Sequence, residues 1–142
     1  MGIHARTSNE REMRPGGVIP EIWNRFMKEG LPEMVPTRIG NALIALYTDY
    51  ESHEHGEYTF AVGARVHEGA EAGGGLSLWR VPAGRYWNLV TERGPVWQVV
   101  PAAWKRVWAE SGDRTFQTDF EIYDERATDP SNAVVELYVG VR

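Results

Sequence analysis

The chain has 142 residues, of which 42% are hydrophobic and 25% are charged, and we expect residues 1–142 to form a single globular domain. Fifteen Lys and Arg against twenty Asp and Glu give a formal net charge of −5, which argues against direct binding of nucleic acid. The absence of cysteine excludes disulfides, thiol catalysis and zinc–thiolate sites. No apolar run approaches the roughly 18 residues of a membrane span, and no signal peptide is visible. We therefore expect a cytoplasmic protein that does not bind membranes.

The first half of the chain predicts a strand, a helix and two further strands. Apolar residues between Val18 and Glu29 recur with the spacing of one helical face, and the polar tract 51–57 separates two apolar segments. In chain order the expected elements are the end of a strand at residues 2–7, a helix from Val18 to Glu29 that ends at Gly30, and strands at residues 42–50 and 58–66.

The second half predicts the same kinds of element. Gly94-Pro95 opens a helix that Gly112 closes, and Pro101 inside it predicts a kink or a restart. The expected strands lie at residues 76–81, 85–92, 118–124 and 134–141, and Pro82-Ala83-Gly84 forms a turn between the first two.

Three echoes between the halves indicate an internal duplication. Residues 22–27 are echoed by residues 103–108, and residues 62–65 by residues 139–142. Tyr47 is echoed by Tyr123, each close to an acidic residue. The sequence therefore predicts an α+β fold of two tandem strand-helix-strand-strand modules, about 1–68 and about 75–142, related by a pseudo-twofold axis. We expect a ligand groove between the modules.

Glu121 is the candidate carboxylate of that groove. Alternation along its strand puts Phe120 and Ile122 on one face and Glu121 with Tyr123 on the other. If Phe120 and Ile122 pack under a helix, Glu121 faces the groove together with Tyr47. A carboxylate ringed by aromatics suits a lipophilic cation, because the charges pair and the ring faces attract cations. The alternative is a solvated glutamate on a half-buried strand.

Aromatic residues are unusually numerous, with six Trp, six Tyr and four Phe. Trp23 and Trp104 occupy equivalent places in the two predicted helices, where each is either a core anchor or part of a pocket wall. We expect some of these side chains to line a cavity. The candidate ligand-binding residues are Glu121, Tyr47, Tyr123, Trp104, Trp23, Phe26, Trp97 and Tyr138.

No metal site or cofactor is expected. His53 and His55 lie in a polar loop next to several glutamates, but such clusters are usually solvated. Neither a nucleophile elbow of the Gly-x-Ser-x-Gly type nor a phosphate-binding glycine loop occurs.

The chain resembles the GyrI-like small-molecule-binding domains, which also form the effector-binding domain of AraC-type transcription regulators. The resemblance spans nearly the whole chain, and its most specific part is the run from Asp119 to Arg126. The other matching runs are residues 6–10, 19–26, 47–51, 56–59 and 81–86. The resemblance implies tandem modules that bind hydrophobic, often cationic, multidrug-type compounds between them. It also implies that Glu121 is the carboxylate, with Tyr47, Tyr123 and a helix tryptophan such as Trp104 around it.

Two departures from the family pattern bear on assembly and role. The chain starts at about the second strand of the family's first pair, which would leave a sheet edge free to form a homodimer. No helix-turn-helix precedes the domain, so the chain looks like a stand-alone form, as in mobile gene cassettes.

Effector sensing or drug sequestration is the leading functional hypothesis. One alternative is a hydrolase of strained electrophilic compounds, because some stand-alone relatives have that activity. It would use either Glu121 with Tyr47 or Tyr123 as general acid and base on a water, or a pair of carboxylates in which Glu57 or Glu136 is the second acid. A second alternative is a protein-interaction module that acts on an enzyme such as a gyrase.

Overall fold

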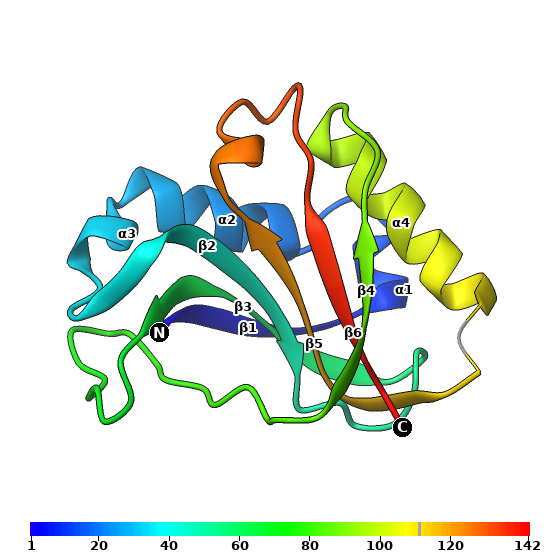
Figure 1. The fold of residues 1–142 in the computed structure, drawn as a ribbon, viewed down its shortest axis with the longest axis horizontal. Helices are drawn as coiled ribbons and strands as arrows, with labels where there is room; N and C mark the ends of the chain where they lie inside the picture. The colour runs from blue at the N-terminus through cyan, green and yellow to red at the C-terminus, as the bar shows by residue number, and fades with distance from the viewer. Residues whose placement is uncertain (111) are drawn as a thin grey trace.

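A six-stranded antiparallel sheet with helices packed on one face forms the fold (Figure 1). The structure is a computed structural model that describes residues 1–110 and 112–142. The strands are β1 (Gly2–Ser8), β2 (Arg38–Thr48), β3 (Glu57–Val66), β4 (Arg85–Val90), β5 (Arg114–Tyr123) and β6 (Glu136–Val141). The helices are α1 (Asn9–Glu12), α2 (Ile19–Lys28), α3 (Leu31–Met34) and α4 (Val96–Glu110), with a 3₁₀ turn, η1 (Glu125–Ala127).

The strand order confirms the predicted tandem modules. The order across the sheet is β1-β3-β2-β5-β6-β4, so β1-α2-β2-β3 and β4-α4-β5-β6 have the same topology. The two halves join through the antiparallel pairing of β2 with β5, which are the equivalent strands of the two modules. An antiparallel pair of equivalent strands places a pseudo-twofold axis between them.

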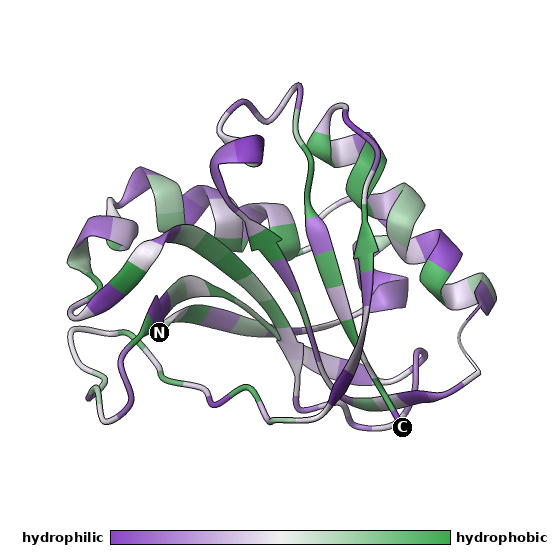
Figure 2. Cartoon of the chain, viewed as in Figure 1, coloured by the Kyte–Doolittle hydropathy of each residue, from purple (hydrophilic) through white to green (hydrophobic). Residues whose placement is uncertain are grey.

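The two faces of the sheet differ in what covers them. Tyr47, Phe60 and Leu137 share the helix face, where they form one core with Phe26 of α2 and Val107 of α4. Hydrophobic and hydrophilic residues alternate along both helices, as expected for helices with one buried side (Figure 2). The opposite face carries no helix and is called the open face below.

The segment at residues 76–81 is not a strand, contrary to the sequence-based prediction. It pairs with β1 only at one bridge, in which Ser77 exchanges two backbone hydrogen bonds with Gly2. Residues 78–81 then line a groove on the open face instead of continuing along β1. Apolar character alone does not make a strand without a partner strand in register. The predicted uncovered edge is therefore covered at Gly2.

Helix α4 runs without interruption from Val96 to Glu110, so it does not restart at Pro101. Both principal helices begin and end close to their predicted bounds. Among the helices of the described residues, none is long and apolar enough to cross a membrane.

Glu12 caps the N-terminus of α2 from outside the helix. Its carboxylate accepts hydrogen bonds from the backbone N–H of Val18 at 2.9 Å and of Ile19 at 3.0 Å, and from the hydroxyl of Thr7. A helix start has unpaired N–H groups and a partial positive charge, so an acceptor of this kind stabilises it. Glu12 therefore fixes the position of α2, the helix that carries Trp23.

We expect Glu12→Ala to lower the free energy of unfolding by about 1–2 kcal/mol, because α2 loses the acceptor for its first N–H groups. Urea denaturation followed by Trp fluorescence measures the change. Glu10→Ala is the matched control, since Glu10 is exposed and pairs only with Arg14. Equal effects of the two substitutions would contradict the capping role.

Candidate functional site

The carboxylate of Glu121 lies between the sheet and α4, and only 1% of the residue is exposed. Tyr47 on β2 donates its hydroxyl to Oε2 at 2.8 Å, and Tyr123 donates to Oε1 at 2.7 Å. The indole Nε1 of Trp104 on α4 donates to Oε2 at 2.6 Å. Three aromatic donors from three elements therefore surround one buried acid.

Pseudo-symmetry explains this arrangement. Ala45 lies directly opposite Glu121 in the β2–β5 register. The two residues are separated by 76 positions, as Tyr47 and Tyr123 are, so they are equivalent positions of the two modules. A pair of equivalent positions that face each other lies on the pseudo-twofold axis. The equivalent tyrosines, Tyr47 and Tyr123, reach the carboxylate from the two halves. Each contacts the tryptophan of one helix, with ring centroids 5.0 Å apart for Tyr47 and Trp104 and 4.7 Å apart for Tyr123 and Trp23.

The site has an acid without a basic partner. None of the ion pairs formed by the described residues includes Glu121, and its three side-chain donors are neutral groups. Burial raises the pKa of Glu121 above its usual value of 4.5, and the three hydrogen bonds oppose this shift. Burial also raises the pKa of Tyr47 and of Tyr123, and the nearby Glu121 adds to the shift. Both tyrosines are therefore donors and not bases at neutral pH.

Asp119, the other buried acid on β5, has its charge balanced by Arg114. Asp119 accepts hydrogen bonds from Arg114 at 2.7 Å, from Tyr50 at 2.6 Å and from the backbone N–H of Gly140 at 2.8 Å. The guanidinium carbon of Arg114 also lies 5.8 Å from the centroid of the Trp104 ring. Glu121, in contrast, forms an ion pair with none of the described residues.

The structure brings together four of the predicted site residues around Glu121 and leaves three elsewhere. Tyr47, Tyr123, Trp104 and Trp23 lie in contact as described above. Phe26 is fully buried in the core, and Trp97 is 62% exposed at the start of α4.

Tyr138 lies on the open face, where its ring stacks on Phe120 with centroids 4.9 Å apart. It does not lie near Glu121, because β6 pairs Tyr138 with Phe120 and Leu137 with Glu121. Paired residues of neighbouring strands share a face of the sheet. The register between distant strands therefore decides this position, and the sequence of β6 alone does not reveal it.

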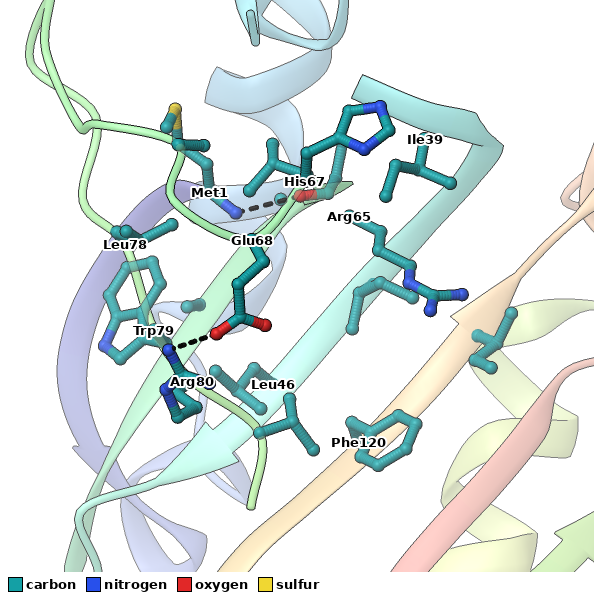
Figure 3. Close-up of a pocket in the computed structure, with 18 of the residues that line it drawn as sticks. Met1, Ile39, Leu46, Arg65, His67, Glu68, Leu78, Trp79, Arg80 and Phe120 are labelled. Carbon is teal, nitrogen blue, oxygen red and sulfur yellow. Dashed lines mark hydrogen bonds and ion pairs between the residues drawn. The ribbon is translucent and has the colours of Figure 1, made fainter. Parts of the chain in front are cut away.

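The condition that Phe120 and Ile122 pack under a helix is not met, because the helices cover the other face of β5. Phe120 and Ile122 face the open side, and Glu121 lies beneath α4. Alternation correctly places Glu121 with Tyr123 and Tyr47, but a period of two does not say which face the helices cover. A cavity of about 900 Å³ lies on the open face (Figure 3), and Glu121 is not among the residues that line it.

The two carboxylates considered for a hydrolytic site do not reach Glu121. Glu136 pairs with Ile122 in the β5–β6 register and forms an ion pair with Arg126 on the open face. Glu57 is exposed at the start of β3. No group of three or more potential metal ligands occurs among the described residues. Tyr50 and Arg114, the partners of Asp119, were not predicted. Alternation places Asp119 on the face of Glu121, which was the one sequence signal for a second polar group there.

The sequence model of one protein family, described as "Integron-associated effector binding protein", matches residues 1–141. A protein of Bacillus subtilis (strain 168), named "Putative transcriptional regulator protein YobU", is 33% identical over 144 residues, which cover 99% of this chain and 90% of that protein.

Two solved structures have the same fold. The integron cassette protein VCH_CASS2 of Vibrio cholerae matches with a TM-score of 0.74 at 29% identity, covering 99% of this chain and 88% of that chain. A protein of Staphylococcus aureus MU50, described as a "Putative bacterial transcription regulation protein", matches with a TM-score of 0.72 at 15% identity, covering 99% of this chain and 90% of that chain. The second likeness shows the fold alone.

We expect Glu121→Gln to make the protein more stable than the parent at neutral pH. Burial raises the pKa of Glu121 in the folded state, so the folded protein holds this proton more tightly than the unfolded chain. The free energy of unfolding therefore falls as pH rises from the unfolded pKa through the raised folded pKa. Urea denaturation of both proteins as a function of pH, from below the unfolded pKa to neutral and mildly alkaline pH, measures the difference.

Glu136→Gln is the control of opposite sign. Hydrogen bonding to Arg126 lowers the pKa of Glu136, so its charge stabilises the fold above the unfolded pKa, and this contribution is lost as pH falls. The account is contradicted if Glu121→Gln loses stability at neutral pH as Glu136→Gln does.

Proposed function

The chain belongs to the family of integron-associated effector-binding proteins, and from this premise we propose that it binds lipophilic cations between α2 and α4. Membership of an effector-binding family indicates a small-molecule partner. We propose further that the ligand is cationic and that Glu121 supplies the counter-charge.

The observation that carries this proposal is the uncompensated carboxylate. Keeping an ionised acid in a buried site costs free energy unless a charge of opposite sign accompanies it. Glu121 has hydrogen-bond donors but no cation. A bound cation would provide that charge, and its apolar groups would replace water around it.

The surrounding rings have the character that such a ligand requires. Tyr47, Trp104, Tyr123 and Trp23 present aromatic surface, and ring faces attract cations within about 6 Å of their centroids. Because Glu121 is almost fully buried, the ligand has to displace a ring to reach it. Trp23 is half-buried and makes no hydrogen bond to Glu121, so we infer that this side chain moves first.

We propose that the biological role is effector sensing or sequestration of cationic drugs in the cytoplasm. The names of two relatives support a regulatory or cassette-borne role, since one is "Putative transcriptional regulator protein YobU" and another is an integron cassette protein. A hydrolytic role that uses a pair of carboxylates is less well supported, because the two carboxylates considered for it lie apart from Glu121. The Glu–Tyr form of that role remains the alternative, since Tyr47 and Tyr123 both donate to Glu121.

A homodimer through the edge of β1 also belongs to this proposal. Beyond the bridge at Gly2, β1 forms its ladder only with β3 on the inner side. An edge strand of this kind is able to pair with a second copy.

We expect tetraphenylphosphonium, a permanent lipophilic cation, to bind the protein, and Glu121→Gln to weaken that binding by about ten- to a hundredfold. The estimate corresponds to a loss of about 1.4–2.8 kcal/mol from one buried charge interaction. Because protonation neutralises Glu121, the affinity of the parent should rise with pH through the raised pKa, and that of Glu121→Gln should not. Isothermal titration calorimetry measures both effects.

Triphenylphosphine oxide, a neutral compound with similar rings, and the variant Glu136→Gln are the controls. We expect Glu121→Gln to change the affinity for the neutral compound little, and Glu136→Gln to leave binding of the cation unchanged. Equal losses for cation and neutral compound in Glu121→Gln would refute the electrostatic basis of the proposal.

A further inference from the structure

A groove of about 900 Å³ lies on the open face, separated from Glu121 by the sheet itself (Figure 3). Its floor is apolar and comes from the central strands. The residues of the floor are Ile44, Leu46, Phe120, Ile122 and Tyr138. A pocket of this volume is within the range of sites for small organic ligands, roughly 300–1,000 Å³.

The loop between β3 and β4 builds the walls of the groove. Leu78 and Trp79 stand on one side, and Arg65 at the end of β3 stands on the other (Figure 3). Two contacts hold this loop against β1. One is the bridge between Ser77 and Gly2, and the other is the edge contact of Trp79 with His4, whose ring centroids are 5.2 Å apart. These walls make the feature a trough instead of a flat sheet surface.

The charged side chains of the trough differ in whether they form ion pairs. Arg80 and Glu68 pair with each other at 2.8 Å and are strongly exposed. Arg65 is exposed and takes part in none of the side-chain hydrogen bonds or ion pairs formed by the described residues. Arg65 is therefore an exposed cation without an ion-pair partner among the described residues, and the N-terminal ammonium of Met1, which donates to the carbonyl of Ala64 at 2.8 Å, also lines the trough.

We propose that this trough binds an amphipathic organic anion, a molecule with one carboxylate on an aliphatic or aromatic body. Arg65 pairs with the carboxylate, and the apolar body lies on Ile44, Leu46 and Phe120. A guanidinium is suited to this role because its N–H groups match the two oxygens of a carboxylate.

A small molecule fits the trough better than a second copy of the chain does. The apolar floor lies in a hollow of about 900 Å³ that Leu78 and Trp79 flank, and this volume is within the range of small-ligand sites, roughly 300–1,000 Å³. The trough also does not depend on the cation site. Glu121 lies on the other face of β5, and the anion would contact only its neighbours Phe120 and Ile122.

Three probes with the same twelve-carbon chain test the proposal: dodecanoate, dodecanol and dodecyltrimethylammonium, each below its micellar concentration. Isothermal titration calorimetry gives the affinities, and methyl NMR spectra locate the probe. We expect dodecanoate to bind about fivefold more tightly than dodecanol, and to shift the methyl signals of Ile44, Leu46 and Ile122. The preference should shrink as salt is added, because the pair with Arg65 is exposed.

Two variants test the residues named. Arg65→Gln should weaken dodecanoate binding about three- to fivefold and leave dodecanol unaffected, whereas Arg11→Gln, an exposed arginine of α1, should change neither. Leu78 is 44% exposed, so Leu78→Glu should leave the fold intact while it repels the anion from the wall. Met13→Glu, at a residue that is 73% exposed outside the trough, is its control.

Glu121→Gln distinguishes binding in the trough from binding at the proposed cation site. The variant should bind dodecanoate with the affinity of the parent protein. The proposal is overturned if dodecanoate does not bind, if it binds no better than dodecanol, or if Arg65→Gln leaves its affinity unchanged. It is also overturned if sedimentation velocity shows a dimer that excludes dodecanoate from the trough.

Discussion

An acid buried on the pseudo-twofold axis is the constraint on which the rest of the site depends. Glu121 is surrounded by donors from β2, β5 and α4, so both modules and one helix have to be in place before its carboxylate is satisfied. The axis allows this, because it brings equivalent tyrosines to the two oxygens of a single group. What the arrangement does not provide is positive charge. The fold therefore carries an electrostatic cost that ligand binding can relieve.

Strand β5 divides the molecule into two chemically distinct surfaces. Glu121 faces the helices and aromatic rings, whereas Phe120 and Ile122 face an apolar trough with Arg65 at its rim. Asp119 lies on the same face, but its charge is balanced by Arg114 and it also accepts a hydrogen bond from Tyr50. Asp119 therefore does not need a cationic ligand. The period of two along one strand thus separates the proposed cation site from the trough proposed to bind an organic anion.

Much of this arrangement could be predicted from sequence, because it rests on local periodicity and duplication. The echoes between the halves predicted two tandem modules and matched Tyr47 to Tyr123, and alternation placed Glu121 with Tyr123. The rest depends on contacts between distant segments. The register of β6 moves Tyr138 to the open face, and residues 76–81 have no partner strand in register beyond Ser77. The cap of α2 by Glu12 also escaped prediction, because a polar loop lies between the acid and the helix that it stabilises.

The most direct test of the account is a crystal structure of the complex with tetraphenylphosphonium. The account predicts the cation between α2 and α4, beside the carboxylate of Glu121, with ring faces within about 6 Å and Trp23 displaced from Tyr123. A cation bound elsewhere, with Glu121 still enclosed by Tyr47, Tyr123 and Trp104 as it is here, would contradict the central claim. In that case the buried carboxylate would be a structural group and not the counter-charge of a ligand.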